Sequence, residues 1–126
     1  MNFPDNLKYT KDHEWIRIEG ETGTVGITDY AQGELGDVVF VELPAPGKTV
    51  KQHDAFGTIE AVKAVSDLYA PMSGTVTEVN ADVASAPDAV NKDPYGKGWM
   101  VKVRLADPAE AAELLSADAY RALIGK

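Results

Sequence analysis

The chain has 126 residues, of which 44% are hydrophobic and 25% charged, as expected for one soluble globular domain. Lysine plus arginine number 12 and aspartate plus glutamate number 20, so the net charge is −8, which disfavours nucleic acid and anionic membranes as partners. Cysteine is absent, which excludes disulfides, thiolate metal sites and thiol catalysis.

Targeting, membrane and metal signals are also missing. The longest fully apolar run, near residues 38–41, is far too short to cross a membrane. Residues 1–5 contain neither a basic region nor an arginine-rich amphipathic pattern, so we expect a cytoplasmic protein of bacterial type. His13 and His53 lie far apart in the sequence and form no obvious metal-binding pair.

The first predicted elements are two paired strands. Residues 14–19 alternate in polarity, which places Ile16 and Ile18 on one face and Trp15 on the other. Residues 24–27 follow a turn bracketed by glycines and have strand composition. Together they predict an N-terminal β-hairpin.

A short helix and a strand are predicted next. Residues 29–35 favour a helix with Asp29 as its N-cap, and Gly36 ends it. Residues 38–43 have the strongest strand composition in the chain. Phe40, within this strand, is expected to pack in the core or on a sheet.

Residues 57–74 are the stretch around which the rest of the chain is arranged. Two apolar runs, 57–61 and 65–70, flank Lys63, and Pro71 then forces a turn. This pattern predicts a hairpin with Lys63 at or near its tip. Either a partner grips the small apolar residues around the lysine, or the hairpin is buried and the lysine simply reaches water.

The last third of the chain predicts a loop, a strand and two helices. Residues 80–98 indicate a loop, with one helical turn near 87–90, and residues 99–105 alternate as a strand does. Asp107 is a typical N-cap because a proline and then an acidic residue follow it. Short helices are expected at about 108–124, packed outside the sheets.

These elements predict a mainly β fold. Short strands with frequent turns favour a sandwich of two sheets at about residues 7–105. Gly23, Gly57 and Gly74 each open a strand, but their spacing has no fixed period, which opposes a solenoid.

The lysine lies in a recognisable motif. Residues 60–64 read Glu-Ala-Val-Lys-Ala, and Ala-Pro-Met-Ser-Gly ends eleven residues past the lysine. This resembles the lipoyl-attachment motif, in which a lysine at a hairpin tip carries lipoate in amide linkage. The flanking stretches resemble the H protein of the glycine cleavage system over nearly the whole chain: residues 8–15, 26–32, 35–44 and 91–99.

The resemblance implies a fold and a function. The fold is a barrel-sandwich hybrid of the lipoyl/biotinyl type with short peripheral and C-terminal helices, and residues 1–126 form a single lipoyl-carrier domain. The protein is then a non-catalytic carrier with lipoate bound covalently to Lys63. It shuttles the aminomethyl group of glycine between a pyridoxal-phosphate glycine decarboxylase, a tetrahydrofolate-dependent aminomethyltransferase and a flavin dihydrolipoamide dehydrogenase. We expect a monomer.

Residues beside the lysine are candidates for recognition. The chain has no evident means of activating an acyl donor, so lipoate-attaching enzymes must modify Lys63. We expect Glu60 to orient the lysine or to mark it for such an enzyme. The alternative is an ordinary solvated acid. The small tip residues share in the recognition: Ala61, Val62 and Ala64.

Two further acids are candidates on the resemblance. It implies that Glu14 and Asp67 line a cleft in which the loaded arm is sheltered, and the alternative for each is an ordinary carboxylate of a strand end or loop. Asp12 and Glu34 stand where plant members of the family have a hydroxyl residue and a histidine, so the details of the sheltering stay open here.

Four other functions stay open from the residues. Biotin carriers usually place methionine on both sides of the lysine, which Val62 and Ala64 oppose. Lipoyl domains of 2-oxo acid dehydrogenases commonly place aspartate before it. A lipoyl-relay protein would have the same attachment site. An interaction module with an unmodified Lys63 is the fourth.

Overall fold

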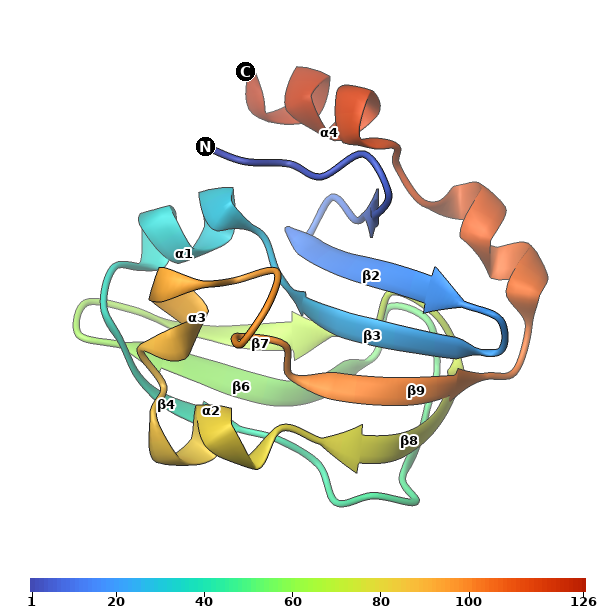
Figure 1. The fold of residues 1–126 in the computed structure, drawn as a ribbon, viewed down its shortest axis with the longest axis horizontal. Coiled ribbons are helices and arrows are strands. Elements are labelled where there is room, and N and C mark those ends of the chain that lie inside the picture. Colours follow the sequence, from blue (N-terminus) through green and yellow to red (C-terminus); the bar gives the residue numbers. More distant parts are fainter.

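Antiparallel strands form two sheets in the computed structural model, which describes residues 1–126 (Figure 1). The larger sheet has the strand order β1-β2-β3-β9-β8-β5 and the smaller has the order β4-β6-β7. The strands are β1 (Lys8–Tyr9), β2 (Glu14–Glu19), β3 (Thr22–Ile27), β4 (Val38–Glu42), β5 (Thr49–Val50), β6 (Ala55–Ala61), β7 (Val65–Tyr69), β8 (Gly74–Val79) and β9 (Val101–Leu105). The prediction of a mainly β sandwich is confirmed.

Short helices surround the sheets. They are α1 (Asp29–Leu35), α2 (Ala81–Ser85), α3 (Ala89–Lys92), the 3₁₀ helix η1 (Pro108–Glu113) and α4 (Ala117–Ile124). The prediction of one helical turn within residues 80–98 was incomplete, because that segment holds both α2 and α3. None of these helices combines the length and the apolar character needed to span a membrane.

The N-cap of α1 differs from the prediction. Thr28, not Asp29, caps the helix, since its hydroxyl oxygen accepts a hydrogen bond from the backbone N–H of Ala31 at 3.1 Å. Asp29 is the first helical residue, where a negative charge is also favourable.

The main core lies between the two sheets. It includes Ile16, Ile59, Leu68, Val76 and Val101, all at most 1% exposed. The alternation of β8 breaks between Val76 and Glu78, where a β-bulge shifts the register against β9.

A second apolar cluster covers the outer face of β2. Tyr9, Trp15 and Tyr120 are fully buried in it, together with residues of the N-terminal segment. Figure 1 shows α4 lying beside this segment, so that the two ends of the chain are neighbours. β2 is therefore buried on both faces at Trp15 and Ile16. The alternation in its sequence does not indicate a solvent-exposed face at these two residues.

Candidate functional site

Lys63 lies in the turn between β6 and β7. The last pair of the ladder joins Glu60 to Val65, and the N–H of Ala61 donates to the carbonyl of Ala64 at 2.7 Å, which closes the turn. The prediction of a hairpin at this place is confirmed. Lys63 and its neighbours Val62 and Val65 are exposed, the two valines by 76% and 68%.

The turn rests on the connection between α1 and β4. The N–H of Val62 donates to the carbonyl of Asp37 at 3.0 Å. The side chain of Lys63 runs over Gly36, because a Cβ built at that glycine would lie 3.1 Å from Lys63 Cε. Gly36 ends α1 with φ of 81°, a backbone conformation that suits glycine.

The predicted recognition residues lie around this turn but differ in exposure. Ala61 is buried, whereas Glu60 is exposed on the outer face of the three-stranded sheet, between Phe40 and Val65 of the neighbouring strands. No ion pair joins Glu60 to Lys63. Phe40 is 46% exposed on this sheet, so of its two predicted places, the core or a sheet, it takes the sheet, because strand composition does not indicate which face is covered.

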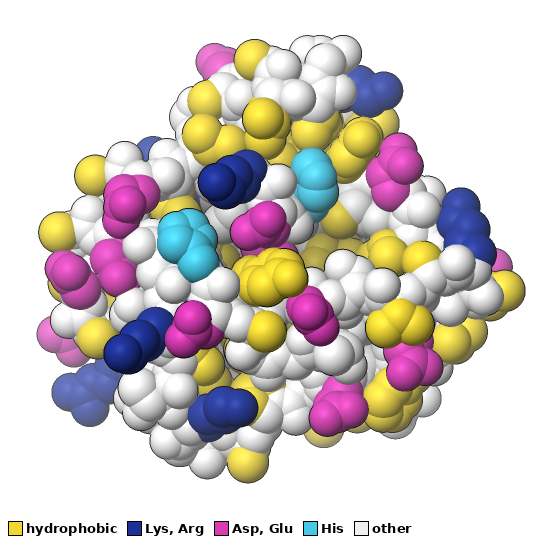
Figure 2. Space-filling model, turned by 180° about the vertical axis from the view of Figure 1, so that it is seen from behind, with side chains coloured by type: hydrophobic (Ala, Val, Ile, Leu, Met, Phe, Trp, Pro, Cys, Tyr) yellow, Lys and Arg dark blue, Asp and Glu magenta, His cyan; other side chains and the backbone are white.

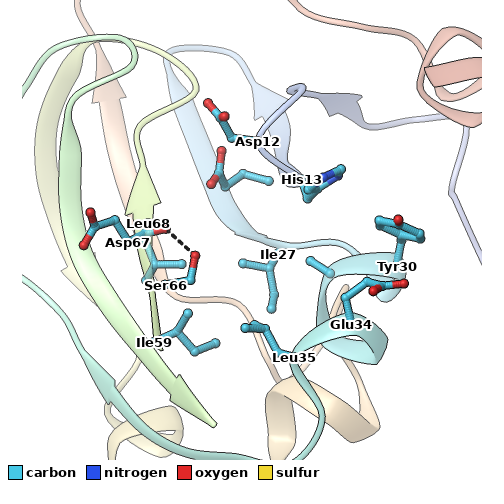
Figure 3. Close-up of a pocket in the computed structure, with 12 residues that line it drawn as sticks. Asp12, His13, Ile27, Tyr30, Glu34, Leu35, Ile59, Ser66, Asp67 and Leu68 are labelled. Carbon is cyan, nitrogen blue, oxygen red and sulfur yellow. Dashed lines mark hydrogen bonds between the residues drawn. The ribbon is translucent and has the colours of Figure 1, made fainter. Parts of the chain in front are cut away.

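A cleft of about 320 Å³ opens next to the hairpin (Figure 3). Three walls surround it: the segment before β2, the helix α1, and the strands β6 and β7. Figure 3 shows the β7 residues Ser66, Asp67 and Leu68 across the cleft from Tyr30 and Glu34 of α1, with Ile27 between them. The carboxylate of Asp67 points away from Ile27 in this view. Seen from behind, the molecule has a hollow with an apolar floor and acidic side chains around it (Figure 2).

Four acidic residues line this cleft, and they come from distant parts of the sequence: Asp12, Glu14, Glu34 and Asp67. The structure thus brings together the two acids that the resemblance singled out, Glu14 and Asp67, and adds the two that depart from plant members. Ile59, Leu68 and Leu35 supply apolar surface between them. An apolar cleft rimmed by acids suits a ligand with a positive charge on a hydrocarbon arm.

Glu14 is the buried member of this group, with only 2% of its surface exposed. Its carboxyl oxygens accept hydrogen bonds from the Thr10 hydroxyl at 2.8 Å and from the backbone N–H of Tyr69 at 3.3 Å. Burial raises the pKa of Glu14 to about 8, with a smaller push from the charge of Asp12, against the lowering effect of the two hydrogen bonds. The carboxyl therefore holds a proton at neutral pH.

Asp67 has a different environment. It is exposed on β7, where it pairs with Thr58 of β6, and the hydroxyl of Tyr69 donates to its Oδ2 at 3.5 Å. Of the two acids that line the cleft, Glu14 is therefore buried and Asp67 is exposed.

His13 is a cleft residue that sequence reasoning missed. It lines the wall beside Asp12 and Glu14, and its backbone has a left-handed φ of 70°. Its Nδ1 lies 2.8 Å from the hydroxyl of Tyr120 in α4, and burial lowers its pKa. The isolated position of His13 in the sequence carried no signal of this contact.

No group of three or more histidine, aspartate or glutamate residues is arranged to hold a metal ion. The residues do fit a group attached to a lysine, because Lys63 is exposed, forms no ion pair and stands beside a cleft of mixed apolar and acidic character. A two-sheet sandwich that presents such a lysine in a hairpin turn defines a carrier domain of the lipoyl/biotinyl type. The chain belongs to the glycine cleavage H-protein family, whose sequence model matches residues 7–126.

Individual relatives agree with this assignment. The chain is 61% identical to the glycine cleavage system H protein of Chlorobium luteolum, with 99% of both chains covered, and 53% identical to that of Staphylococcus carnosus, with 100% of both covered. It also superimposes on the crystal structure of a glycine cleavage system H protein from Mycobacterium marinum. There the TM-score is 0.91 at 42% identity, and the match covers 98% of this chain and 100% of that one.

These matches confirm the predicted family and fold class. They also bear out the role of a lipoylated carrier in the glycine cleavage system, with lipoate held on a lysine. They do not favour a lipoyl-relay protein or a 2-oxo acid dehydrogenase domain.

Proposed function

We propose that Lys63 is the lysine that carries lipoate, and that residues 1–126 act as a single carrier domain. The observation that carries the proposal is the position of Lys63 in an exposed turn. Its side chain lies along Gly36, at the end of α1, and α1 forms one wall of the acidic cleft. An arm attached there can reach into the cleft or out to an enzyme.

The proposed partners are a pyridoxal-phosphate glycine decarboxylase, a tetrahydrofolate-dependent aminomethyltransferase and a flavin dihydrolipoamide dehydrogenase. Membership of the family supports partners within the glycine cleavage system. In this proposal the chain performs no chemical step itself and acts as a monomer, which leaves every side of the hairpin open to enzymes. Tethering raises the local concentration of the reactive group at each docked enzyme.

Once bound, lipoate would supply a disulfide that can accept the aminomethyl group on one sulfur while the other sulfur becomes a thiol. The chain's own residues hold the cargo between enzymes. Asp67, Asp12 and Glu34 attract an ammonium group by charge. Glu14 adds a buried carboxyl at the wall, and Ile59 and Leu68 exclude water from the floor of the cleft.

Attachment of lipoate makes different demands on the hairpin. Acylation requires the neutral amine of Lys63 and an activated donor, which a lipoate-attaching enzyme supplies. The small side chains of Ala61, Val62 and Ala64 keep the tip narrow enough to enter an active site. Because Glu60 makes no ion pair with Lys63, we assign it to recognition by that enzyme and not to orientation of the lysine.

Intact mass and peptide mapping test the attachment site. The chain is incubated with lipoate, ATP and a lipoate ligase, beside Lys63→Arg and the control Lys97→Arg, which changes another exposed lysine. One lipoyl group is expected on the wild type and on Lys97→Arg, mapped to Lys63, and none on Lys63→Arg. A lipoyl group on a different lysine, or none on the wild type, would refute the proposal.

A further inference from the structure

The helix α1 forms one wall of the cleft, although its sequence has a low helix propensity. It has seven residues, Gly33 lies in its middle, and none of its residues is buried. Short helices are marginal in isolation, and glycine lowers helix propensity further. Contacts from elsewhere in the chain must therefore hold this wall in place.

Asn91 of α3 supplies such contacts at the C-terminal end of α1. Its Nδ2 donates to the carbonyl of Gly36 at 2.8 Å and to Oε1 of Gln32 at 3.1 Å, and its Oδ1 accepts from the N–H of Val38 at 2.9 Å. Only this orientation of the amide gives Gly36 a donor and Val38 an acceptor. All its donors and its acceptor are thus used between α1 and β4.

The segment that Asn91 holds is the one on which the lysine turn rests. Gly36 contacts the aliphatic part of the Lys63 side chain, and the carbonyl of Asp37 accepts from the N–H of Val62. Asn91 therefore acts on the turn indirectly. It bonds Gly36, which contacts Lys63, and it bonds Val38, which follows the Asp37 that accepts from Val62. Loss of its amide would leave a carbonyl and an N–H unpaired on either side of Asp37.

The residues after Asn91 hold the other end of the same helix. The hydroxyl of Tyr95 accepts from the N–H of Asp29 at 3.0 Å. The carbonyl of Pro94 accepts from Trp15 Nε1 at 3.0 Å, which joins this segment to β2. Residues 91–95 thus contact both ends of α1.

We propose that Asn91 is a positioning residue that places Lys63 relative to the cleft, while Tyr95 fixes the opposite end of the α1 wall. Only the expected effect of Asn91 on release of the aminomethyl group rests on the proposed function. The positioning itself is a property of the chain before lipoate is attached.

Amide hydrogen exchange of the unlipoylated full chain tests the positioning. In Asn91→Ala, exchange at Val38 and Val62 is expected to quicken by roughly 10-fold, the effect of losing about one hydrogen bond. Asn91→Asp keeps an oxygen that accepts from the N–H of Val38. It replaces the Nδ2 donor with a second oxygen, which cannot donate to the carbonyl of Gly36 or to Gln32. Here Val38 is expected to stay protected while Val62 exchanges faster.

Glu110→Ala is the matched control. It removes the carboxylate that accepts two short hydrogen bonds from Ser73, from the N–H at 2.6 Å and from the hydroxyl at 2.7 Å, and Glu110 does not line the cleft. Exchange at Val62 is expected to stay at the wild-type rate in this variant. Equal exchange at Val62 in Asn91→Ala and Glu110→Ala would overturn the proposal.

A second readout follows the cargo. In lipoylated, loaded protein, spontaneous release of the aminomethyl group is expected to be roughly 3- to 10-fold faster in Asn91→Ala than in Glu110→Ala. Release at the same rate in both would overturn the positioning role. If the wild type takes up no lipoate at Lys63, the proposed function fails, but the exchange experiment still decides whether Asn91 positions the turn.

Discussion

The hydroxyl of Tyr120 lies 2.8 Å from Nδ1 of His13, although the two residues are 107 positions apart. The same hydroxyl lies 2.8 Å from Oγ1 of Thr28, the N-cap of α1. Burial raises the pKa of Tyr120 to about 12 and lowers the pKa of His13, so a protonated phenol meets a neutral imidazole at neutral pH. The C-terminal helix therefore supports two walls of the cleft through one oxygen atom.

Tyr120→Phe is expected to loosen the cleft while the fold persists. The ring keeps its stacking on Tyr9, whose centroid is 5.0 Å away, but His13 and Thr28 lose their partner. Stability is expected to fall by about 1 to 2 kcal/mol, and release of cargo to quicken. Urea unfolding and the release rate measure the two effects.

Tyr9→Phe is the control for this variant, because its hydroxyl donates to the carbonyl of Pro4 at 2.7 Å and lies outside the cleft. A similar loss of stability without faster release is expected. If both variants release cargo at the wild-type rate, α4 has no part in the cleft.

Two glycines three residues apart are expected to respond in opposite directions to alanine. Gly36 has φ of 81°, and its new Cβ would press on Lys63, so Gly36→Ala is expected to cost about 1 to 2 kcal/mol. Gly33 is helical with open space around its Cα, so Gly33→Ala is expected to stabilise by about 0.5 to 1 kcal/mol. Denaturant midpoints measure both. Equal effects would contradict the backbone assignment of Gly36.

Glu14 is expected to make the protein less stable as pH rises. Its folded pKa of about 8 exceeds the ordinary value of 4.5, so the folded state keeps a proton that the unfolded state has lost between these values. The stability that this proton provides is complete below about pH 4.5 and is lost as pH rises to about 8.

The comparison of wild type with Glu14→Gln isolates this effect. The free energy of unfolding of the wild type is expected to decline relative to that of the variant by about 1.4 kcal/mol per pH unit across this window. Urea unfolding at several pH values measures it. A constant difference between the two proteins would mean that Glu14 is ionised in the fold.

Glu14→Ala combined with Asp67→Ala is expected to shorten the lifetime of the cargo on the carrier by roughly 10-fold, since each removes a carboxyl from a residue that lines the cleft. The control pair is Glu21→Ala with Asp54→Ala, both exposed and outside the cleft. Release of formaldehyde and ammonia without the transferase measures the lifetime. The sheltering role is wrong if the two double variants behave alike.

Glu60→Gln is expected to slow lipoate attachment roughly 3- to 10-fold, because removal of an exposed charge at an enzyme interface weakens association. Glu21→Gln changes an exposed acid in the turn between β2 and β3 of the larger sheet, and it should leave the rate unchanged. Mass spectrometry over time follows the reaction. An unchanged rate in Glu60→Gln would remove its recognition role.

The sequence by itself determined the local features. The hairpin at residues 57–69 was predictable because two apolar runs flank Lys63 and Pro71 follows them. Asp107 and Ser116 cap helices through their own side chains. The alternation of residues 101–105 likewise matches the buried positions of β9. Each of these depends on neighbours a few residues away, and local backbone preferences suffice to decide them.

Only the tertiary structure decided what surrounds the lysine. The cleft draws its walls from segments before β2, in α1 and in β7. Asn91 contacts Gly36, 55 positions away, and Tyr120 contacts His13, 107 positions away. No local pattern encodes them, because a polar side chain such as Asn91 has the same propensity whether it faces water or bridges two elements. Its role appears when packing of the two sheets removes water and leaves each buried polar group in need of a partner.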